Sequence, residues 1–201
     1  MFFRLFTSLM FVGCVFSTNS KLDTLYINVE NSKLRWQGSK ISSNHYGHID
    51  IKNGYIVVDS DNDIIGGLID IDMNSMVCDD IKDPNSNAYL IRHLKAEDFF
   101  DVSKFPLSSL QIEKSERLKA SSKIYNRKIS GQLNIKGNSK SIIFPLMVNH
   151  EKNFSHASGE INFDRTLWGI NYKSSKFFPD LGDRIILDII NLKFYIETIK
   201  K

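Results

Sequence analysis

Residues that commonly perform catalysis or hold metal ions are few in this sequence, and their spacing matches no catalytic motif. The five histidines are His45, His48, His93, His150 and His156. His45 and His48 lie three residues apart in a region with strand character, so on a flat strand they should point to opposite faces. The sequence contains no HExxH, paired-cysteine, GxSxG, GxGxxG or P-loop motif. It therefore predicts neither a metal site nor an activated nucleophile.

The segment Asp98–Asp101 suggests an apolar lid, because it places two adjacent aromatic rings between two carboxylates. It follows a predicted short helix, Ala88 to Lys95, whose leucine and isoleucine side chains share one face. A helix at this point has no hairpin to make, so its apolar face must cover the end or the interior of the fold. Phe99 and Phe100 then either close an apolar pocket over a ligand or complete the core beneath the helix.

The composition favours β structure in a single globular domain. The chain has 201 residues, of which 42% are hydrophobic and 24% charged, and these values exclude wholesale disorder. Only four alanines occur, fewer than a helical bundle would use, whereas Ile, Phe and Tyr are plentiful. The net charge of +3 is small and evenly spread, which excludes an electrostatic nucleic-acid binder.

Alternation of apolar and polar residues predicts a succession of strands. Asn53-Gly54 is typical of a hairpin, Gly66-Gly67 of a bulge or sharp bend, and Gly137-Asn138 of a second tight turn. Strands joined by such turns form an antiparallel sheet, which should close into a barrel or fold into a sandwich so that no edge stays open. The predicted strands are Tyr26–Glu30, Lys33–Gln37, His48–Lys52, Tyr55–Asp59, Ile64–Met73, Leu107–Ile112, Lys123–Lys136, Ser141–Asn149, Phe154–Phe163 and Ile185–Ile199.

The first twenty residues have the features of a secretory signal. Met1 to Phe16 holds one charge, Arg4, and an apolar run that is too short to span a bilayer and has the period of neither a strand nor a helix. We expect residues 1–20 to be a signal cleaved between Phe16 and Lys21, and residues 21–201 to form the domain. A periplasmic or secreted location follows from this expectation.

Cys14 offers a second outcome of export. Phe11-Val12-Gly13-Cys14 is similar to the lipobox of bacterial lipoproteins, so an acylated Cys14 would tether the domain to a membrane. In either case Cys78 has no cysteine to pair with, and the domain must depend on its hydrophobic core. Cys78 itself is expected to be a small buried or half-buried residue.

Several blocks, in order, resemble the YceI family of secreted bacterial lipid-binding proteins. The block His93–Asp101 is the most specific of them, and together they cover essentially the whole chain after the signal. The sequence departs from the family pattern at Ala96 and Asn134, where Ser and Thr are usual. The matching blocks are Lys33–Gly38, His45–Ile49, Ile69–Met76, His93–Asp101, Phe105-Pro106, Gly131–Gly137 and Phe163–Tyr172.

The resemblance implies an all-β fold, a lipocalin-like barrel of eight antiparallel strands with a short helical lid. It implies that a long apolar interior takes an amphiphile such as a polyisoprenoid, an isoprenoid quinone or a fatty-acid derivative, with no other cofactor. An eight-stranded barrel has room for one small ligand among its inward side chains. The 14 Phe, 7 Tyr and 2 Trp are enough to line such a pocket and to close it.

The candidate ligand-binding residues each have a structural alternative. Trp36, Trp168 and Tyr172 are either ligand contacts or wall, and His93 either meets a head group or anchors the lid. Arg165 either meets a head group or pairs with Asp164 or Asp98. The full candidate set is Trp36, His93, Leu94, Phe99, Phe100, Phe105, Arg165, Trp168 and Tyr172.

Two functions from different classes remain open at this point. The first is binding, transport or storage of a lipid without catalysis. The second is an enzyme or accessory factor that presents a bound isoprenoid for modification, and a weaker third is an interaction module with a filled core. No cluster of basic residues along the sequence marks a phosphate cradle, so tail length should matter more to binding than head-group charge. The oligomeric state stays open between a monomer and a homodimer.

Overall fold

The computed structural model describes residues 21–119, 124–150 and 154–199, so the expected signal and Cys14 lie outside the described residues. Strands dominate the described part of the chain, with one α-helix and 3₁₀ turns at Arg165–Trp168 and Pro179–Arg184. The elements are β1 Asp23–Ile27, β2 Lys33–Ser39, β3 Asn44–Val58, β4 Ile64–Cys78, α1 Pro84–Lys95, β5 Leu107–Arg117, β6 Arg127–Ile135, β7 Asn138–His150, β8 Phe154–Asp164 and β9 Ile189–Ile199.

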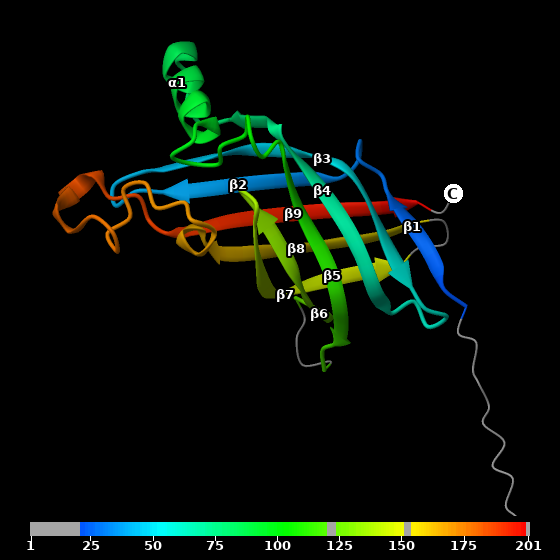
Figure 1. The fold of residues 1–201 in the computed structure, drawn as a ribbon. Coiled ribbons are helices and arrows are strands. Elements are labelled where there is room, and N and C mark those ends of the chain that lie inside the picture. The colour runs from blue at the N-terminus through cyan, green and yellow to red at the C-terminus, as the bar shows by residue number, and fades with distance from the viewer. Residues whose placement is uncertain (1–20, 120–123, 151–153, 200–201) are drawn as a thin grey trace, which may run out of the picture.

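The strands form one closed antiparallel barrel (Figure 1). Pairing runs from β3 through β2, β9, β8, β7, β6, β5 and β4, and β4 pairs with β3 to close the ring. β1 and β2 share one position, because each pairs with both β3 and β9, at different heights along these two strands. Nine strands therefore fill eight positions, and the predicted eight-stranded barrel is confirmed.

The hairpin predicted at Asn53-Gly54 is wrong. Both residues lie inside β3, which continues to Val58, and they pair with Asp70 and Ile69 of β4 after a register shift. A Cβ on Gly54 would lie 2.6 Å from Ile27 Cδ1 and 2.9 Å from the carbonyl oxygen of Leu68. The glycine is thus required by close packing of neighbouring strands, a role that the Asn-Gly pattern alone does not distinguish from a turn.

The other two glycine signals mark a bulge and a turn, as predicted. At Gly66-Gly67 the β3–β4 register shifts, because Gly66 pairs with Val57 whereas Ile64 pairs with Val58. At the second site Ile135 pairs with Asn138, and the two residues between them have φ of 51° and 73°. The left-handed turn residues are Lys136 and Gly137, and Asn138 already begins β7.

Helix α1 begins four residues earlier than predicted. Asp83 caps it, since its carboxylate accepts a hydrogen bond of 2.7 Å from the Ser86 amide, and Pro84 occupies the first helical position. Asn87, the residue just before the predicted helix, lies inside α1 and donates to the carbonyl oxygens of Cys78 and Ile81. No residue of α1 is buried, and Figure 1 shows the helix standing off one end of the barrel.

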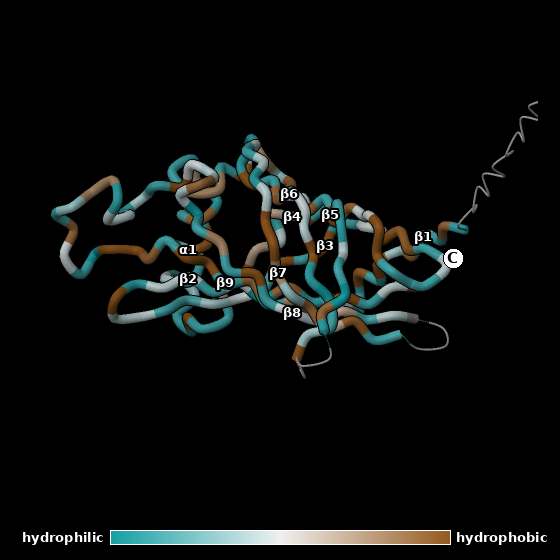
Figure 2. The backbone as a smooth tube through the Cα atoms, turned by 90° about the horizontal axis from the view of Figure 1, so that it is seen from below, coloured by the Kyte–Doolittle hydropathy of each residue, from teal (hydrophilic) through white to brown (hydrophobic). Residues whose placement is uncertain are grey.

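Inward-facing aliphatic and aromatic side chains fill much of the barrel. Figure 2 shows hydrophobic and hydrophilic positions interleaved along the strands. Cys78 is buried and free, as expected. β9 begins at Ile189 rather than Ile185, and the predicted strand start at Lys123 lies outside the described residues. No helix in the described ranges has the length and apolar character needed to cross a membrane.

Candidate functional site

A cavity with a volume of about 330 Å³ lies at one end of the barrel, under α1. We call it the mouth cavity, because exposed side chains such as Lys40 and Tyr89 contribute to its lining. Apolar side chains make up most of its wall, among them Ile71, Met73 and Met76 of β4. A cavity of this kind can accept an apolar ligand with a small number of polar contacts at the opening.

The structure brings seven of the nine candidate binding residues to the mouth cavity. Phe105 and Trp168 are the two that do not line it. The seven that do are Trp36, His93, Leu94, Phe99, Phe100, Arg165 and Tyr172.

Three aromatic side chains form a cluster beneath the helix. The ring centroid of His93 lies 5.1 Å from that of Phe99 and 4.6 Å from that of Tyr172, and Phe99 lies 5.4 Å from Tyr172. Phe99 is 4% exposed and also lines the cavity. Phe99 therefore belongs to the core and to the cavity wall at once, while Phe100 is a half-buried neighbour on the same wall.

Trp168 and Phe105 pack against other parts of the fold and do not line the mouth cavity. Trp168 is 1% exposed, donates from its indole N–H to the Leu133 carbonyl oxygen at 2.9 Å, and packs edge-on against Phe163. The Phe105 ring lies against the Lys136-Gly137 turn, where a Cβ on Gly137 would approach it to 2.6 Å. Trp168 ends the 3₁₀ turn Arg165–Trp168 and Phe105 lies before β5, so strand alternation in the sequence could not place either residue.

Arg165 is a buried anchor whose acidic partner is Asp188 rather than the predicted Asp164 or Asp98. It is 1% exposed and lies 3.3 Å from the Asp188 carboxylate. Its guanidinium also donates to the carbonyl oxygens of Leu187, Ile170 and Ile186. Burial lowers the pKa of Arg165, and the nearby carboxylates oppose that shift. These bonds tie the turn after β8 to the segment before β9.

The two acidic residues expected to pair with Arg165 have other partners. The Asp164 carboxylate accepts hydrogen bonds from the amide and hydroxyl of Thr166 and pairs with Lys176. Asp98 lies 3.7 Å from the His93 ring nitrogen. The His93–Asp98 contact joins α1 to the turn that follows it, and the His93 ring also lines the cavity.

His45 is a cavity residue that the sequence did not single out. It lies on β3, and its Nδ1 is 2.8 Å from Asp80 Oδ2. Burial disfavours the ionised form of Asp80, but hydrogen bonds from the Tyr46 amide, His45 and Cys78 outweigh it and lower the pKa of Asp80. His48, three residues along, is more exposed and pairs with Asp79, so the two histidines face opposite sides as expected.

Two lysines bring positive charge to the cavity. Lys40 comes from the β2–β3 connection, and Lys173 follows the turn after β8, with its ammonium 5.1 Å from the Tyr172 ring centroid. No aspartate or glutamate occurs among the described lining residues. The two lysines are far apart in the sequence, and only the closure of the barrel brings them to one opening, so no basic cluster was visible there.

The described residues contain no group of three or more His, Cys, Asp or Glu side chains placed to hold a metal ion. Cys78 donates a hydrogen bond to Asp80 at 3.2 Å. Burial raises the pKa of the Cys78 thiol. The thiolate is the nucleophilic form of cysteine, so this environment makes Cys78 a poor nucleophile.

Solved structures with the same fold come from several bacteria. Burkholderia cenocepacia BcnA superposes with a TM-score of 0.62 at 16% identity, over 85% of this chain and 98% of that one. A polyisoprenoid-binding domain from Saccharophagus degradans, implicated in plant cell wall breakdown, gives 0.61 at 12% identity, over 90% and 100%. A Campylobacter jejuni YceI protein gives 0.56 at 20% identity, over 76% and 84%.

Because all three identities are low, these likenesses establish the fold alone. Curated proteins gave no sequence match. A family model, however, matches nearly all of the barrel. It describes a YceI-like domain and covers residues 25–198, from β1 to the end of β9. The chain therefore belongs to the YceI-like family.

Proposed function

We propose that this protein binds a long-chain amphiphile, with the tail inside the barrel and the polar head at the opening under α1. The observation that carries the proposal is the mouth cavity of about 330 Å³, whose walls are mostly apolar. Burying an apolar tail there would release about 0.8 kcal/mol for each methylene removed from water. The fold shared with the polyisoprenoid-binding domain of Saccharophagus degradans supports the same ligand class.

The lining favours a head group that is anionic or accepts hydrogen bonds. Lys40 and Lys173 supply positive charge, and His45 and His93 supply ring nitrogens. Arg165 already donates to three carbonyl oxygens and Asp188, so it supports the wall rather than the head group. Candidates include a fatty acid, a polyisoprenoid carrying an acidic group and an isoprenoid quinone, whose carbonyl oxygens accept hydrogen bonds.

We propose a binding role without catalysis. The cavity wall is apolar on most of its surface, and its buried polar members Ser108 and Arg165 already have partners, the Met73 sulfur and backbone carbonyl oxygens. General acid–base or nucleophilic catalysis needs a base within hydrogen-bond reach of the group that it activates. The rings of His45 and His93 contact Asp80 and Asp98, and no hydroxyl or thiol of the described residues hydrogen-bonds to either ring as a nucleophile would.

We also propose that the domain acts outside the cytoplasm, either free after removal of residues 1–20 or tethered through an acylated Cys14. The support is the short apolar run of Met1 to Phe16. Intact-mass analysis of exported protein separates the two forms, since one begins near Lys21 and the other begins at Cys14 with added acyl mass. Exported protein that retains Met1 to Phe16 would contradict both.

Titration with prenyl and acyl ligands of increasing length, at low and high salt, tests the binding function. Affinity should rise about fourfold for each added methylene until the tail is fully buried. The double variant Lys40→Ala/Lys173→Ala should weaken binding of fatty acids more than binding of the matching alcohols. An affinity that does not depend on chain length but falls sharply at high salt would indicate binding to surface charges instead.

A further inference from the structure

The interior of the barrel contains a second cavity beyond the mouth cavity. This base cavity has a volume of about 90 Å³ and lies in the half of the barrel away from α1, towards the opposite end. Its lining is almost entirely aliphatic and aromatic, and its polar members come from the far ends of β7, β8 and β9. These are His150, Ser155, His156 and Thr198.

Three residues line both cavities: Ile71 of β4, Leu133 of β6 and Leu192 of β9. Around the eight positions of the barrel, β4 and β6 are two positions apart, β6 and β9 are three apart, and β9 and β4 are again three apart. Inward side chains from strands so spaced converge on the barrel axis. Ile71, Leu133 and Leu192 therefore form a waist between the cavities.

The inward residues of β9 give the same order along the barrel. Ile190 lines the mouth cavity alone, Leu192 lines both cavities, and Phe194 and Ile196 line the base cavity alone. Alternate residues of a strand point to the same face and are spaced about 7 Å apart. On β9, Leu192 is thus the inward residue at which the mouth cavity ends and the base cavity begins.

We propose that the base cavity is a terminal subsite, which binds the end of a ligand tail that has passed the waist. A methylene has about the volume of a water molecule in the liquid, about 30 Å³, so the base cavity holds about three such groups and the mouth cavity about eleven. The protein then selects tails long enough to reach beyond Ile71, Leu133 and Leu192. This inference rests on the proposed function, because it requires a tail in the mouth cavity.

Ala157→Leu is the variant that tests the subsite. Ala157 on β8 is half-buried and lines the base cavity alone, so a leucine there adds three carbons to the space that the tail end would occupy. The probes are straight-chain fatty acids from octanoate to stearate. Wild-type affinity should increase with each methylene until the base cavity is full, whereas in Ala157→Leu the increase should stop about three carbons earlier. The loss for the longest acids is then about fiftyfold, at about 0.8 kcal/mol per methylene.

Two further variants keep the test decisive. Ile190→Ala lies on the same sheet but lines the mouth cavity alone, so it should weaken acids that fill that cavity without moving the stopping point to shorter acids. Should Ala157→Leu fail to fold, Leu192→Phe narrows the waist and should produce the same early stop.

The outcomes separate the subsite from the proposed function. In one outcome, the affinity of wild type, Ala157→Leu and Leu192→Phe stops increasing at the same chain length. That result would overturn the terminal subsite and leave the proposed function intact. Failure of every acid to bind wild type would overturn both.

Discussion

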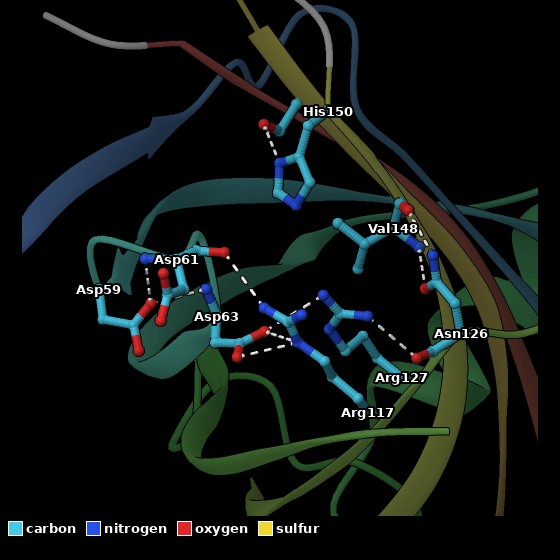
Figure 3. Close-up of polar contacts among 9 residues, drawn as sticks. Asp59, Asp61, Asp63, Arg117, Asn126, Arg127, Val148 and His150 are labelled. Carbon is cyan, nitrogen blue, oxygen red and sulfur yellow. Dashed lines mark hydrogen bonds and ion pairs between the residues drawn. The ribbon is translucent and has the colours of Figure 1, made fainter. Parts of the chain in front are cut away.

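The two ends of the barrel are built differently. At the mouth end, α1 covers the opening without a single buried residue, and the polar groups of the lining come from α1, the loops and the strands. At the base end, charged side chains join neighbouring strand connections directly (Figure 3). The base is thus closed by ion pairs between strand connections, whereas the mouth is covered by an exposed helix that lies above a buried aromatic cluster.

The base network is centred on Asp63, in the connection between β3 and β4. Its carboxylate accepts from Arg117 Nε at 2.7 Å and from Arg127 Nη2 at 3.2 Å, which links the end of β5 and the start of β6 to that connection. Asn126 adds two amide hydrogen bonds to the backbone of Val148 on β7. Figure 3 shows these contacts converging at one end of the sheet.

At the mouth, the aromatic cluster beneath α1 should contribute most to stability. Phe99→Ala should therefore lower the free energy of unfolding more than any other change considered. The ring is 4% exposed and contacts His93, Phe100 and Tyr172, so its loss should lower the free energy of unfolding by about 4 kcal/mol. Urea denaturation measures this. Tyr89→Ala, at an exposed position of α1, is the control and should change stability little; equal losses in the two variants would show that the cluster is not part of the core.

Arg165→Met should have the next largest effect, a loss of about 3 kcal/mol. Methionine keeps much of the aliphatic volume but leaves three carbonyl oxygens without their donor and the Asp188 carboxylate without its buried partner. Lys173→Ala nearby should stay within about 0.5 kcal/mol of wild type, since Lys173 is not in an ion pair with any described residue. Thermal unfolding of both variants decides whether Arg165 anchors this wall.

Phe100→Ala should weaken ligand binding by about tenfold, equivalent to about 1.4 kcal/mol, because its half-buried ring lines the mouth cavity. Phe105→Ala is matched to it, being an aromatic truncation on the same connection at a residue that does not line the cavity. Titration with one long-chain fatty acid compares the two. If the Phe105 variant loses as much affinity as the Phe100 variant, the cavity assignment does not explain binding.

Much of the barrel follows from the sequence, because period-2 alternation and turn residues are local signals. They predict the order of the strands and the single helix, and the resemblance of the blocks adds the closure. Asn53-Gly54 misleads because a glycine required by tertiary packing has the same local signature as a turn glycine. The helix start was missed because Asp83-Pro84 suits a turn as well as a capped helix.

The candidate site was predicted less completely, for a different reason. Of the seven candidates that reach the cavity, Trp36 alone lies on a strand; the others lie on α1, in the turn after it and in the segment after β8, all within the blocks that resemble the family. Lys40 and His45 were missed as site residues, since their role depends on how the β2–β3 connection faces the turn after β8. The true partner of Arg165, Asp188, lies 23 residues away, beyond the reach of a local pattern.

At the base, Asp63→Asn should cost about 1 kcal/mol at neutral pH, since Arg117 and Arg127 lose a shared carboxylate that is partly exposed to water. The hydrogen bond from Arg117 is the main cause that lowers the pKa of Asp63 below 3.8. A lowered carboxyl pKa contributes stability above the unfolded-state pKa, and that contribution disappears as the pH falls through the folded-state value. The stability difference between wild type and Asp63→Asn should therefore be full near pH 7 and shrink below about pH 4. A difference that stays constant down to about pH 2 would contradict the assignment.

The smallest expected effect on stability comes from the titration of His150. This residue lines the base cavity and is influenced by the charges of Asp63, Arg117 and Arg127. Burial is the first cause that lowers the pKa of His150 below 6.5, and Arg127 and Arg117 act in the same direction against Asp63. Its Nδ1 lies 2.8 Å from Ser155 Oγ, a contact that needs no charge on the ring.

Below pH 6.5 the unfolded chain binds a proton at His150 that the folded chain does not yet bind, so stability falls as the pH drops from neutral towards the folded-state pKa. His150→Gln keeps a polar group beside Ser155 but cannot titrate, and its stability should depend less on pH in that interval. NMR titration of the His150 ring, together with unfolding of both proteins across the interval, measures the effect. A folded-state pKa at or above 6.5 would mean that water or the Asp63 carboxylate, rather than the apolar base cavity and the arginines, controls this ring.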